Sequence, residues 1–362
     1  MALFLASAAC IAQSADSTDN TITEPKGISI TGLWQGSFTI PHSPAMKHLA
    51  QSHPNGAELN VQLQTTGKET WHKLHRYPKI GLNLNYYNYH EPVLGKSVAL
   101  SFYINKPMWQ DRKQQLNLRL GTGIAWFNRI YTLHENHKNT IISQAINAVL
   151  QTRLEYEWHF SEPVSLSAGI GLNHYSNGAT SKPNLGINLP AATLGLTYYT
   201  HRPQNYLSAD PGGFNKKHFY NISAGVGYKQ LNFSDGRKYL AATGSVYYLK
   251  PLNRKSNLVA GLDGFFDTSV TAAQKEDSTF TGSYNNKRAA VLIGHELLFG
   301  RLIFQTHLAF YVYLPYLGAD RIYYERLGVK YHFTNRVFGN VALKVHRGSA
   351  DFIEWGVGVR LK

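Results

Sequence analysis

Apolar residues recur at every second position in many segments of this chain, from about residue 79 to the C-terminus. The last such segment covers residues 352–361, and its apolar positions are Ile353, Trp355, Val357, Val359 and Leu361. Alternation with a period of two is typical of a β-strand that has one apolar face. The segments run for about 10 to 13 residues, which is long enough for a tilted strand to cross a bilayer.

This alternation predicts about sixteen strands, an even number, as is usual in single-chain bacterial barrels. The predicted strands cover residues 29–41, 56–66, 79–89, 96–107, 112–127, 150–161, 163–177, 189–201, 216–229, 238–250, 256–269, 283–298, 300–313, 321–333, 336–348 and 350–362. The predicted fold class is all-β, a transmembrane antiparallel β-barrel. A count of about 14 strands is one alternative, because the first two segments alternate less clearly. An eight-stranded barrel followed by a second β unit is another.

The composition agrees with a membrane barrel. Charged residues make up 16% of the chain, whereas a typical soluble protein has about 25%. No apolar run approaches the roughly 18 residues of a transmembrane helix, which excludes a helical membrane protein. A soluble β-sandwich would also alternate. Here, however, the polar strand faces are rich in Gly, Asn and Ser, and Tyr and Trp recur near strand ends, as in membrane barrels.

The connections between strands predict which end of the barrel faces outward. Three short connections, at residues 160–163, 299–301 and 333–336, fall on one side, which we assign to the periplasm. Residues 178–188 then connect two strands on the extracellular side. We expect a short helix in the long connection 128–149. We expect another in residues 43–52, with Ser43 as N-cap and Pro44 at the first helical position.

The N-terminal residues MALFLASAACIAQSADS form a short apolar block that ends in small residues, as in a secretory signal peptide. We expect cleavage after Ala12 or Ser14, so that residues 1–14 form the signal peptide. Cys10, the one cysteine of the chain, lies in this block without the preceding Leu of a lipoprotein acceptor site. Cleavage would remove it, and would exclude disulfides, zinc thiolates and a cysteine nucleophile from the mature protein.

The charge balance narrows the choice of partners. The chain has 36 Lys and Arg residues against 22 Asp and Glu, a formal net charge of +14. The basic residues are scattered and no nucleic-acid motif is present, so no nucleic-acid partner is expected. They form either a solvated basic surface or one that attracts the phosphates of lipopolysaccharide, beside the other membrane lipids. His134 and His137 have Glu135 alone as a nearby ligand, so we expect no metal and no other cofactor.

Within residues 171–199, side chains that could act as a base and a nucleophile fall on the apolar face of a predicted strand. In the strand that enters this segment, Val, Leu and Ile residues occupy alternate positions, and the same parity puts His174 and Ser176 among them. Residues i and i+2 lie about 7 Å apart along a strand, so a hydrogen bond between these two side chains is within reach. On the next strand, Asn188 has the parity of the apolar face.

This segment resembles the lipid A 3-O-deacylase (PagL) family, whose members are outer-membrane β-barrel hydrolases. The resemblance rests on His174-Tyr175-Ser176-Asn177, on Pro183-Asn184, and on Gly186-Ile187 followed by a polar residue at position 188. It implies that His174 is a general base, that Ser176 is a nucleophile, and that position 188 completes the triad. The family has Glu at that third position and this chain has Asn188. The resemblance further implies that Asn184 helps to hold the oxyanion.

The resemblance also divides the chain. It implies that residues 29–201 form a deacylase-like barrel of eight strands that carries the H-x-S motif on the seventh. Residues 202–362 lie outside the resemblance, and we expect them to supply further barrel strands.

Acyl transfer requires an activated nucleophile and donors for the oxyanion. The Asn184 amide or the backbone N–H groups of residues 177–179, including those of Asn177 and Gly178, could supply these donors. Asn188 can orient His174 through its carbonyl oxygen, but it cannot stabilise an imidazolium as a carboxylate does. Because an Asp→Asn change in a serine protease triad costs about 10⁴ in rate, we expect reduced or altered activity.

The sequence therefore predicts an outer-membrane esterase that removes an ester-linked acyl chain from lipid A. The alternative is a non-catalytic barrel, either a pore or a surface-binding protein, because about sixteen strands in one barrel would enclose an aqueous lumen. In that case His174 and Ser176 would be ordinary interface residues. Glu155, Glu157, His346 and Glu354 have the parity of the interior, and we do not expect them to take part in catalysis.

Overall fold

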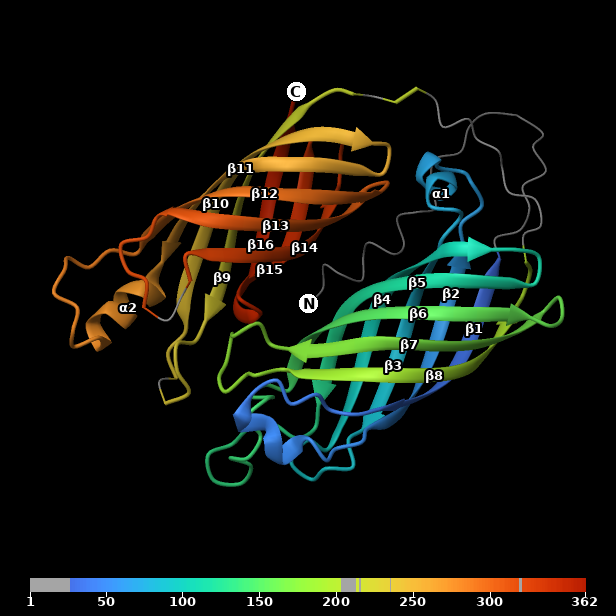
Figure 1. Cartoon of the computed structure of the whole chain (residues 1–362), viewed down its shortest axis with the longest axis horizontal. Helices are drawn as coiled ribbons and strands as arrows, with labels where there is room; N and C mark the ends of the chain where they lie inside the picture. Colours follow the sequence, from blue (N-terminus) through green and yellow to red (C-terminus); the bar gives the residue numbers. More distant parts are fainter. Residues whose placement is uncertain (1–26, 203–212, 215, 235, 319–320) are drawn as a thin grey trace.

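The structure is a computed structural model that describes residues 27–202, 213–214, 216–234, 236–318 and 321–362. Its strands form two separate closed barrels (Figure 1). The strands of the first barrel are β1 (Ile28–Ser37), β2 (Asn55–Gln64), β3 (Lys79–Asn88), β4 (Lys96–Gln110), β5 (Gln114–Phe127), β6 (Ile146–His159), β7 (Val164–Ser176) and β8 (Ile187–Tyr199). Those of the second are β9 (Phe219–Lys229), β10 (Tyr239–Asn253), β11 (Ser256–Asp267), β12 (Lys287–Phe299), β13 (Leu302–Tyr313), β14 (Tyr323–His332), β15 (Val337–His346) and β16 (Ser349–Leu361).

The all-β fold and the count of about sixteen strands are confirmed, and each predicted strand overlaps one of those observed. The strands do not form a single large barrel, however. The sheet closes after β8, which pairs antiparallel with β1, and β9 pairs with β16 instead of with β8. The arrangement is thus the alternative of an eight-stranded barrel with a second β unit, and this second unit is itself a closed barrel.

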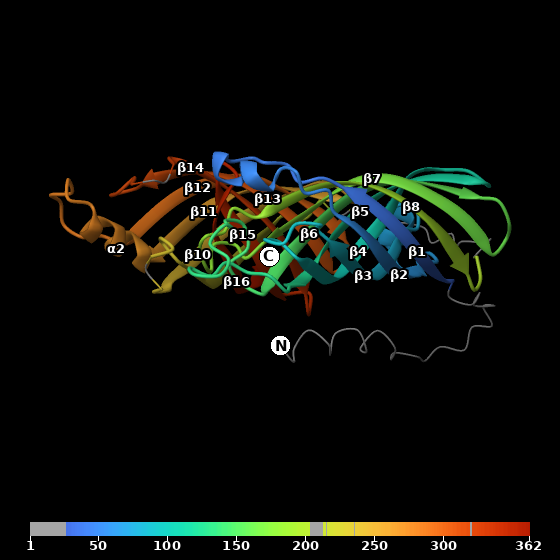
Figure 2. The same ribbon diagram turned by 90° about the horizontal axis from the view of Figure 1, so that it is seen from below.

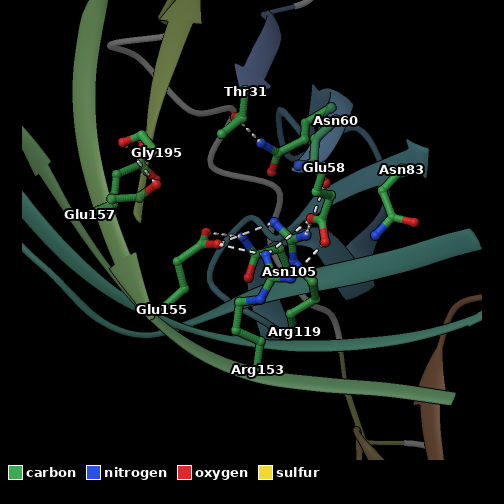
Figure 3. A network of polar contacts seen from close by, with 12 residues as sticks. Thr31, Glu58, Asn60, Asn83, Asn105, Arg119, Arg153, Glu155, Glu157 and Gly195 are labelled. Atoms are coloured by element: carbon green, nitrogen blue, oxygen red, sulfur yellow. Dashed lines mark hydrogen bonds and ion pairs between the residues drawn. The ribbon is translucent and has the colours of Figure 1, made fainter. Parts of the chain in front are cut away.

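Paired polar side chains fill the interior of the first barrel (Figure 3). At the centre of this network, the Glu58 carboxylate accepts hydrogen bonds from Arg119 Nη1 at 2.7 Å and from Arg153 Nη2 at 2.6 Å. Glu155 lies beside them, with its Oε2 3.3 Å from Arg119 Nη2. Buried charges are costly unless they are paired, so the two acids and two bases compensate one another. Arg119 is only 1% exposed. A water-filled pore would leave it accessible, and the lumen is therefore closed.

The second barrel has an interior of the same kind. Arg326 Nη1 lies 2.8 Å from Asp263 Oδ2, and its Nη2 lies 3.4 Å from Glu354 Oε2. Towards the other end, Lys229 and Lys344 both pair with Asp351, each at 2.5 Å. The inward parity predicted for Glu354 is confirmed by this pairing, and the aqueous lumen of a single large barrel is absent.

The outward face of both barrels is apolar. Ile170 of the first barrel and Val357 of the second are 67% and 65% exposed, and they belong to a large set of exposed Leu, Ile, Val, Phe, Trp and Tyr side chains on alternate strand positions. Exposed apolar surface of this extent marks a face that contacts lipid. Among the described residues, no helix is both long and apolar enough to cross a membrane.

The two ends of each barrel differ in the length of their connections. The turns 111–113, 160–163, 254–255, 300–301 and 333–336 are short and lie at the end where each barrel begins and ends. The opposite end carries most of the longer loops, which we assign to the outer surface. One loop contains the 3₁₀ helix η1 (Pro44–Leu49), which begins at Pro44 as predicted, although the Ser43 side chain makes no capping hydrogen bond.

Two further predictions concern a helix in the connection 128–149 and the signal peptide. The helix expected within residues 128–149 is wrong, because residues 128–145 form turns and irregular structure and β6 begins at Ile146. The predicted signal peptide, residues 1–14, lies outside the described residues.

The two barrels lie side by side in one layer (Figures 1 and 2), with α1 (Thr70–Leu74) against β12. At this short-turn end, the His75 imidazole stacks on Phe299 with ring centroids 4.1 Å apart, and its Nε2 lies 2.7 Å from the Leu298 carbonyl oxygen. Since a carbonyl only accepts, the Nε2–H of His75 donates. His75 is 1% exposed and is therefore buried where the barrels meet.

We expect contact between the barrels at this end to weaken as the pH falls from about 6.5 towards 4. Burial lowers the pKa of His75 to about 4; the hydrogen bond to Leu298 opposes this fall, and the ammonium groups of Lys106 and Lys255 add to it. These two lysines and His295 are the other titratable groups around the adjoining cavity of about 260 Å³. Separated barrels would leave His75 solvated, so they would bind more protons in this range. The contribution of His75 to the free energy of docking is therefore complete only above about pH 6.5 and is lost as the pH falls towards 4.

Energy transfer between dyes on the exposed turns 160–163 and 333–336 would measure this effect. The matched control is His75→Gln, which keeps an N–H donor for the Leu298 carbonyl but does not titrate. Equal pH dependence in the wild type and in this variant would show that His75 is not the group responsible.

Candidate active site

The candidate site lies at the outer end of the first barrel, where β7 passes into the loop 177–186 and then into β8. Tyr175 is fully buried in the barrel and packs edge-on against Phe127, with ring centroids 5.6 Å apart. Because successive side chains alternate across a strand, an inward Tyr175 directs His174 and Ser176 outward. His174 pairs in register with Asn188 on β8, so these two side chains share the outer face.

Two donors converge on the Ser176 hydroxyl. Its Oγ accepts hydrogen bonds from the Gly178 backbone N–H at 3.1 Å and from Asn184 Nδ2 at 2.9 Å. A serine hydroxyl has two acceptor lone pairs and one hydrogen. With both lone pairs occupied, the O–H is left to donate to a base. The same two N–H groups could donate hydrogen bonds to an oxyanion formed next to Oγ.

The orientation of the Asn184 amide follows from its second contact. The Asn177 backbone N–H donates to Asn184 Oδ1 at 3.2 Å, so the NH₂ group must face Ser176. The Asn177 side chain in turn donates to Ser143 Oγ and to the Ser181 carbonyl oxygen, both at 3.0 Å. Asn177 is thus occupied in holding Asn184 and the loop.

The side chain at the third triad position contacts the imidazole. His174 Nδ1 lies 2.7 Å from Asn188 Oδ1. An amide oxygen only accepts, so His174 carries its hydrogen on Nδ1, and in the neutral ring Nε2 is then an acceptor. This is the tautomer that a general base requires.

A residue remote in sequence fixes this arrangement. His42, in the loop after β1, has its Nε2 3.0 Å from the Leu185 carbonyl oxygen and its Nδ1 3.2 Å from Asn188 Nδ2. The carbonyl requires the Nε2–H of His42 to donate, so Nδ1 of the neutral ring accepts from the Asn188 NH₂ group. The Asn188 oxygen must then point to His174. The Leu185 carbonyl thereby determines the tautomer of His174 through two intervening side chains.

His174 and Ser176 both lie against Gly186. This glycine has φ +71°, and a Cβ built on it would lie 3.1 Å from His174 Cε1 and 3.3 Å from Ser176 Cβ. No hydrogen bond joins the two described side chains of His174 and Ser176. Such bonds are often long in free enzymes and shorten when the substrate is bound.

The structure thus brings together His174, Ser176, Asn184, Asn188 and Gly178, which the sequence analysis had singled out. It adds His42, which the sequence analysis missed, because no motif links a loop histidine to a residue more than a hundred positions later. Glu155 and Glu157 point into the lumen and are buried, as predicted. Among the described residues, no three His, Cys, Asp or Glu side chains lie close enough to hold a metal ion.

Comparison with protein-family models assigns both barrels. Residues 55–197 match the lipid A 3-O-deacylase (PagL) model, and residues 218–362 match the acyloxyacyl hydrolase C-terminal domain. This chain belongs to the PagL and acyloxyacyl hydrolase family. The PagL match includes β7, the loop that follows it, and β8 as far as residue 197. Residues 218–362, which the sequence resemblance had left unexplained, are the C-terminal domain of the family.

Family membership supports a hydrolase that acts on lipid A in the outer membrane. No curated protein sequence matches the chain. Among solved structures, the chain is similar to Neisserial surface protein A, with 10% identity, coverage of 47% of this chain and 96% of that one, and a TM-score of 0.32. It is also similar to the N-terminal β-barrel domain of Pseudomonas aeruginosa OprF, with 14% identity, coverage of 48% and 97%, and a TM-score of 0.28. Similarities this low say nothing of activity.

Proposed function

We propose that this protein is an outer-membrane esterase that hydrolyses an ester-linked acyl chain of lipid A, with Ser176 as nucleophile and His174 as base. The observation that carries the proposal is the Ser176 hydroxyl, whose Oγ accepts from two N–H donors while its own hydrogen remains available. A hydroxyl held in this way, beside an imidazole of defined tautomer, has the parts that acyl transfer requires.

In the proposed reaction, His174 Nε2 takes the Ser176 proton as Oγ attacks the ester carbonyl. The Gly178 N–H and the Asn184 amide then donate to the carbonyl oxygen as it becomes negative. Collapse of this intermediate breaks the bond to the sugar oxygen, which receives the proton from His174. A water molecule, activated by the same imidazole, then hydrolyses the acyl-serine and regenerates the hydroxyl.

The position of the site suits a lipid substrate. It lies on the outward face at the end with the longer loops, next to Leu172 and Leu150 on β7 and β6, both exposed. An acyl chain can lie against such an apolar face while its ester reaches the headgroup boundary, where Ser176 lies. The net charge of +14 favours the phosphorylated headgroup of lipid A.

Mass spectrometry of lipid A tests this proposal. We expect cells that express the protein to contain lipid A lighter by one hydroxyacyl chain, together with the released hydroxy fatty acid. The comparison is with the same host carrying an empty vector. Unchanged lipid A in cells whose outer membrane contains the folded protein would contradict the proposed function.

We expect His42→Phe to lower kcat roughly two- to ten-fold, the equivalent of one hydrogen bond of about 0.5–1.5 kcal/mol. Phenylalanine cannot accept from the Asn188 NH₂ group, so the amide would be free to turn and His174 would lose its defined tautomer. Release of hydroxy fatty acid from lipopolysaccharide at a series of substrate concentrations would measure this loss.

The matched control for this experiment is His53→Phe. His53 lies in the same outer loop and is exposed. Equal kcat for the wild type and both variants would show that His42 does not position Asn188.

A further inference from the structure

We propose that the second barrel positions the oxyanion donors of the first, and that Gln230 is the residue through which it acts. This inference rests on the proposed function and assigns a role to the C-terminal domain within it. The loop 177–186 carries both donors to Ser176 Oγ, namely the Gly178 N–H and the Asn184 amide. Whatever holds this loop therefore sets the geometry of the oxyanion site.

Gln230 directly follows β9 and contacts the loop at two points. Its backbone N–H donates to the Ala179 carbonyl oxygen at 2.9 Å. Its side-chain Oε1 accepts from the Lys182 backbone N–H at 3.0 Å. The Gln230 NH₂ group donates to the Asn232 carbonyl oxygen at 2.8 Å, which directs Oε1 towards the loop. Gln230 is 6% exposed, so water competes little for these bonds.

The apolar surface of the second barrel meets the same loop. A Cβ built on Gly178 would lie 2.3 Å from Ile353 Cγ1 and 3.5 Å from Leu343 Cδ1. Ile353 and Leu343 belong to β16 and β15 of the second barrel. Gly178, the residue that supplies the backbone donor, therefore packs directly on this barrel.

The loop backbone is in a conformation that needs such support. Gly178 has φ +63° and Ala179 has φ +66°, and the left-handed region is unfavourable for a residue with a Cβ. Contacts from the first barrel hold other points of the loop, such as Asn177 on Ser143 and Thr180 on Gln144. Gln230 holds the loop at two further points, Ala179 and Lys182. The two barrels thus share the loop, and displacement of the second barrel would shift the Gly178 N–H.

The test compares three variants of the full-length protein in detergent with purified lipopolysaccharide as substrate. Gln230→Ala removes the side-chain bond to Lys182. Gln230→Glu keeps an acceptor for it. Gln274→Ala is the matched control, because Gln274 forms a similar pair of hydrogen bonds to Asn285 within the outer loop of the second barrel that contains α2 (Thr268–Glu276). Hydrogen exchange of residues 177–186 is measured alongside kcat and KM.

We expect Gln230→Ala to lower kcat about five- to twenty-fold with KM within about twofold, because a misplaced oxyanion donor affects the transition state more than substrate binding. Exchange in residues 177–186 should quicken in this variant. Gln230→Glu should restore part of both properties, because it keeps the acceptor for Lys182 but loses the donor to Asn232. Gln274→Ala should change neither. A Gln230→Ala protein with wild-type kcat and wild-type exchange would overturn the inference. So would an equal loss of activity in Gln274→Ala.

Failure of the proposed function would look different. A folded wild-type protein that releases no acyl chain would overturn the esterase proposal, and the catalytic role of Gln230 with it. Exchange in residues 177–186 would then still decide whether Gln230 holds the loop.

Discussion

Replacement of Ser176 by Ala is expected to lower lipid A deacylation by a factor on the order of 10³ to 10⁶, the range in which serine hydrolases lose activity without their nucleophile. The change removes Oγ, the atom on which Gly178 and Asn184 converge. The loss should appear in kcat, since no acyl-enzyme can form. Release of hydroxy fatty acid from lipopolysaccharide and the mass of the remaining lipid A would both measure it.

The double variant Ser176→Ala/His174→Ala should be no slower than Ser176→Ala, because the base has no role once the nucleophile is gone. Ser167→Ala is a suitable control. Ser167 lies on the same strand but points inward, where its hydroxyl donates to the Gly195 carbonyl oxygen. If lipid A is deacylated equally by the wild type and by folded Ser176→Ala protein, Ser176 is not the nucleophile.

Replacement of Asn184 by Ala is expected to lower kcat by about 10² to 10³, the usual cost of removing one oxyanion donor. Asn184 Nδ2 lies 2.9 Å from Ser176 Oγ, and the Asn177 N–H holds its amide in that orientation. Asn184→Asp should be as slow as Asn184→Ala. A carboxylate still accepts from Asn177 but cannot donate to the oxyanion, and it would repel the developing charge.

A loop asparagine away from the site provides the control for Asn184. Asn136 donates to the Ile130 carbonyl oxygen in its own outer loop and to the Val93 carbonyl oxygen in the neighbouring one. Asn136→Ala should therefore leave kcat unchanged while disturbing a loop of the same kind. An Asn184→Asp protein with wild-type kcat would exclude a donor role for this side chain.

The strands could be predicted because apolar and polar or small residues alternate along each strand, whichever strands it pairs with. One face of every strand meets lipid and the other meets a packed interior, so residues such as Ile170 and Val357 are separated by small or polar ones. The error in residues 128–145 has a physical cause. The apolar residues of this segment cover another surface and do not form one face of a helix. Ile141 and Ile142 are instead buried in the cluster that closes the outer end of the first barrel.

The local part of the site could be predicted from strand parity. Once β7 alternates, His174 and Ser176 must share the outer face, and the loop 177–186 returns the chain so that Asn188 on β8 lies opposite His174. The loop after β1 could not be placed in this way. His42 reaches Asn188 because the sheet closes β1 against β8, a pairing between strands at opposite ends of the first half of the chain.

The sequence by itself determined that this chain is built of about sixteen amphipathic strands and that His174, Ser176 and Asn188 lie on one outward face near a strand end. These properties depend on the period-2 geometry of a single strand and on its nearest neighbour. The tertiary structure alone decided that two barrels form where one was expected, that His42 sets the tautomer of His174 through Asn188, and that Gln230 reaches the loop of the other barrel. Each of these depends on which distant strands pair and close. Alternation cannot specify this, because every strand edge offers the same backbone donors and acceptors.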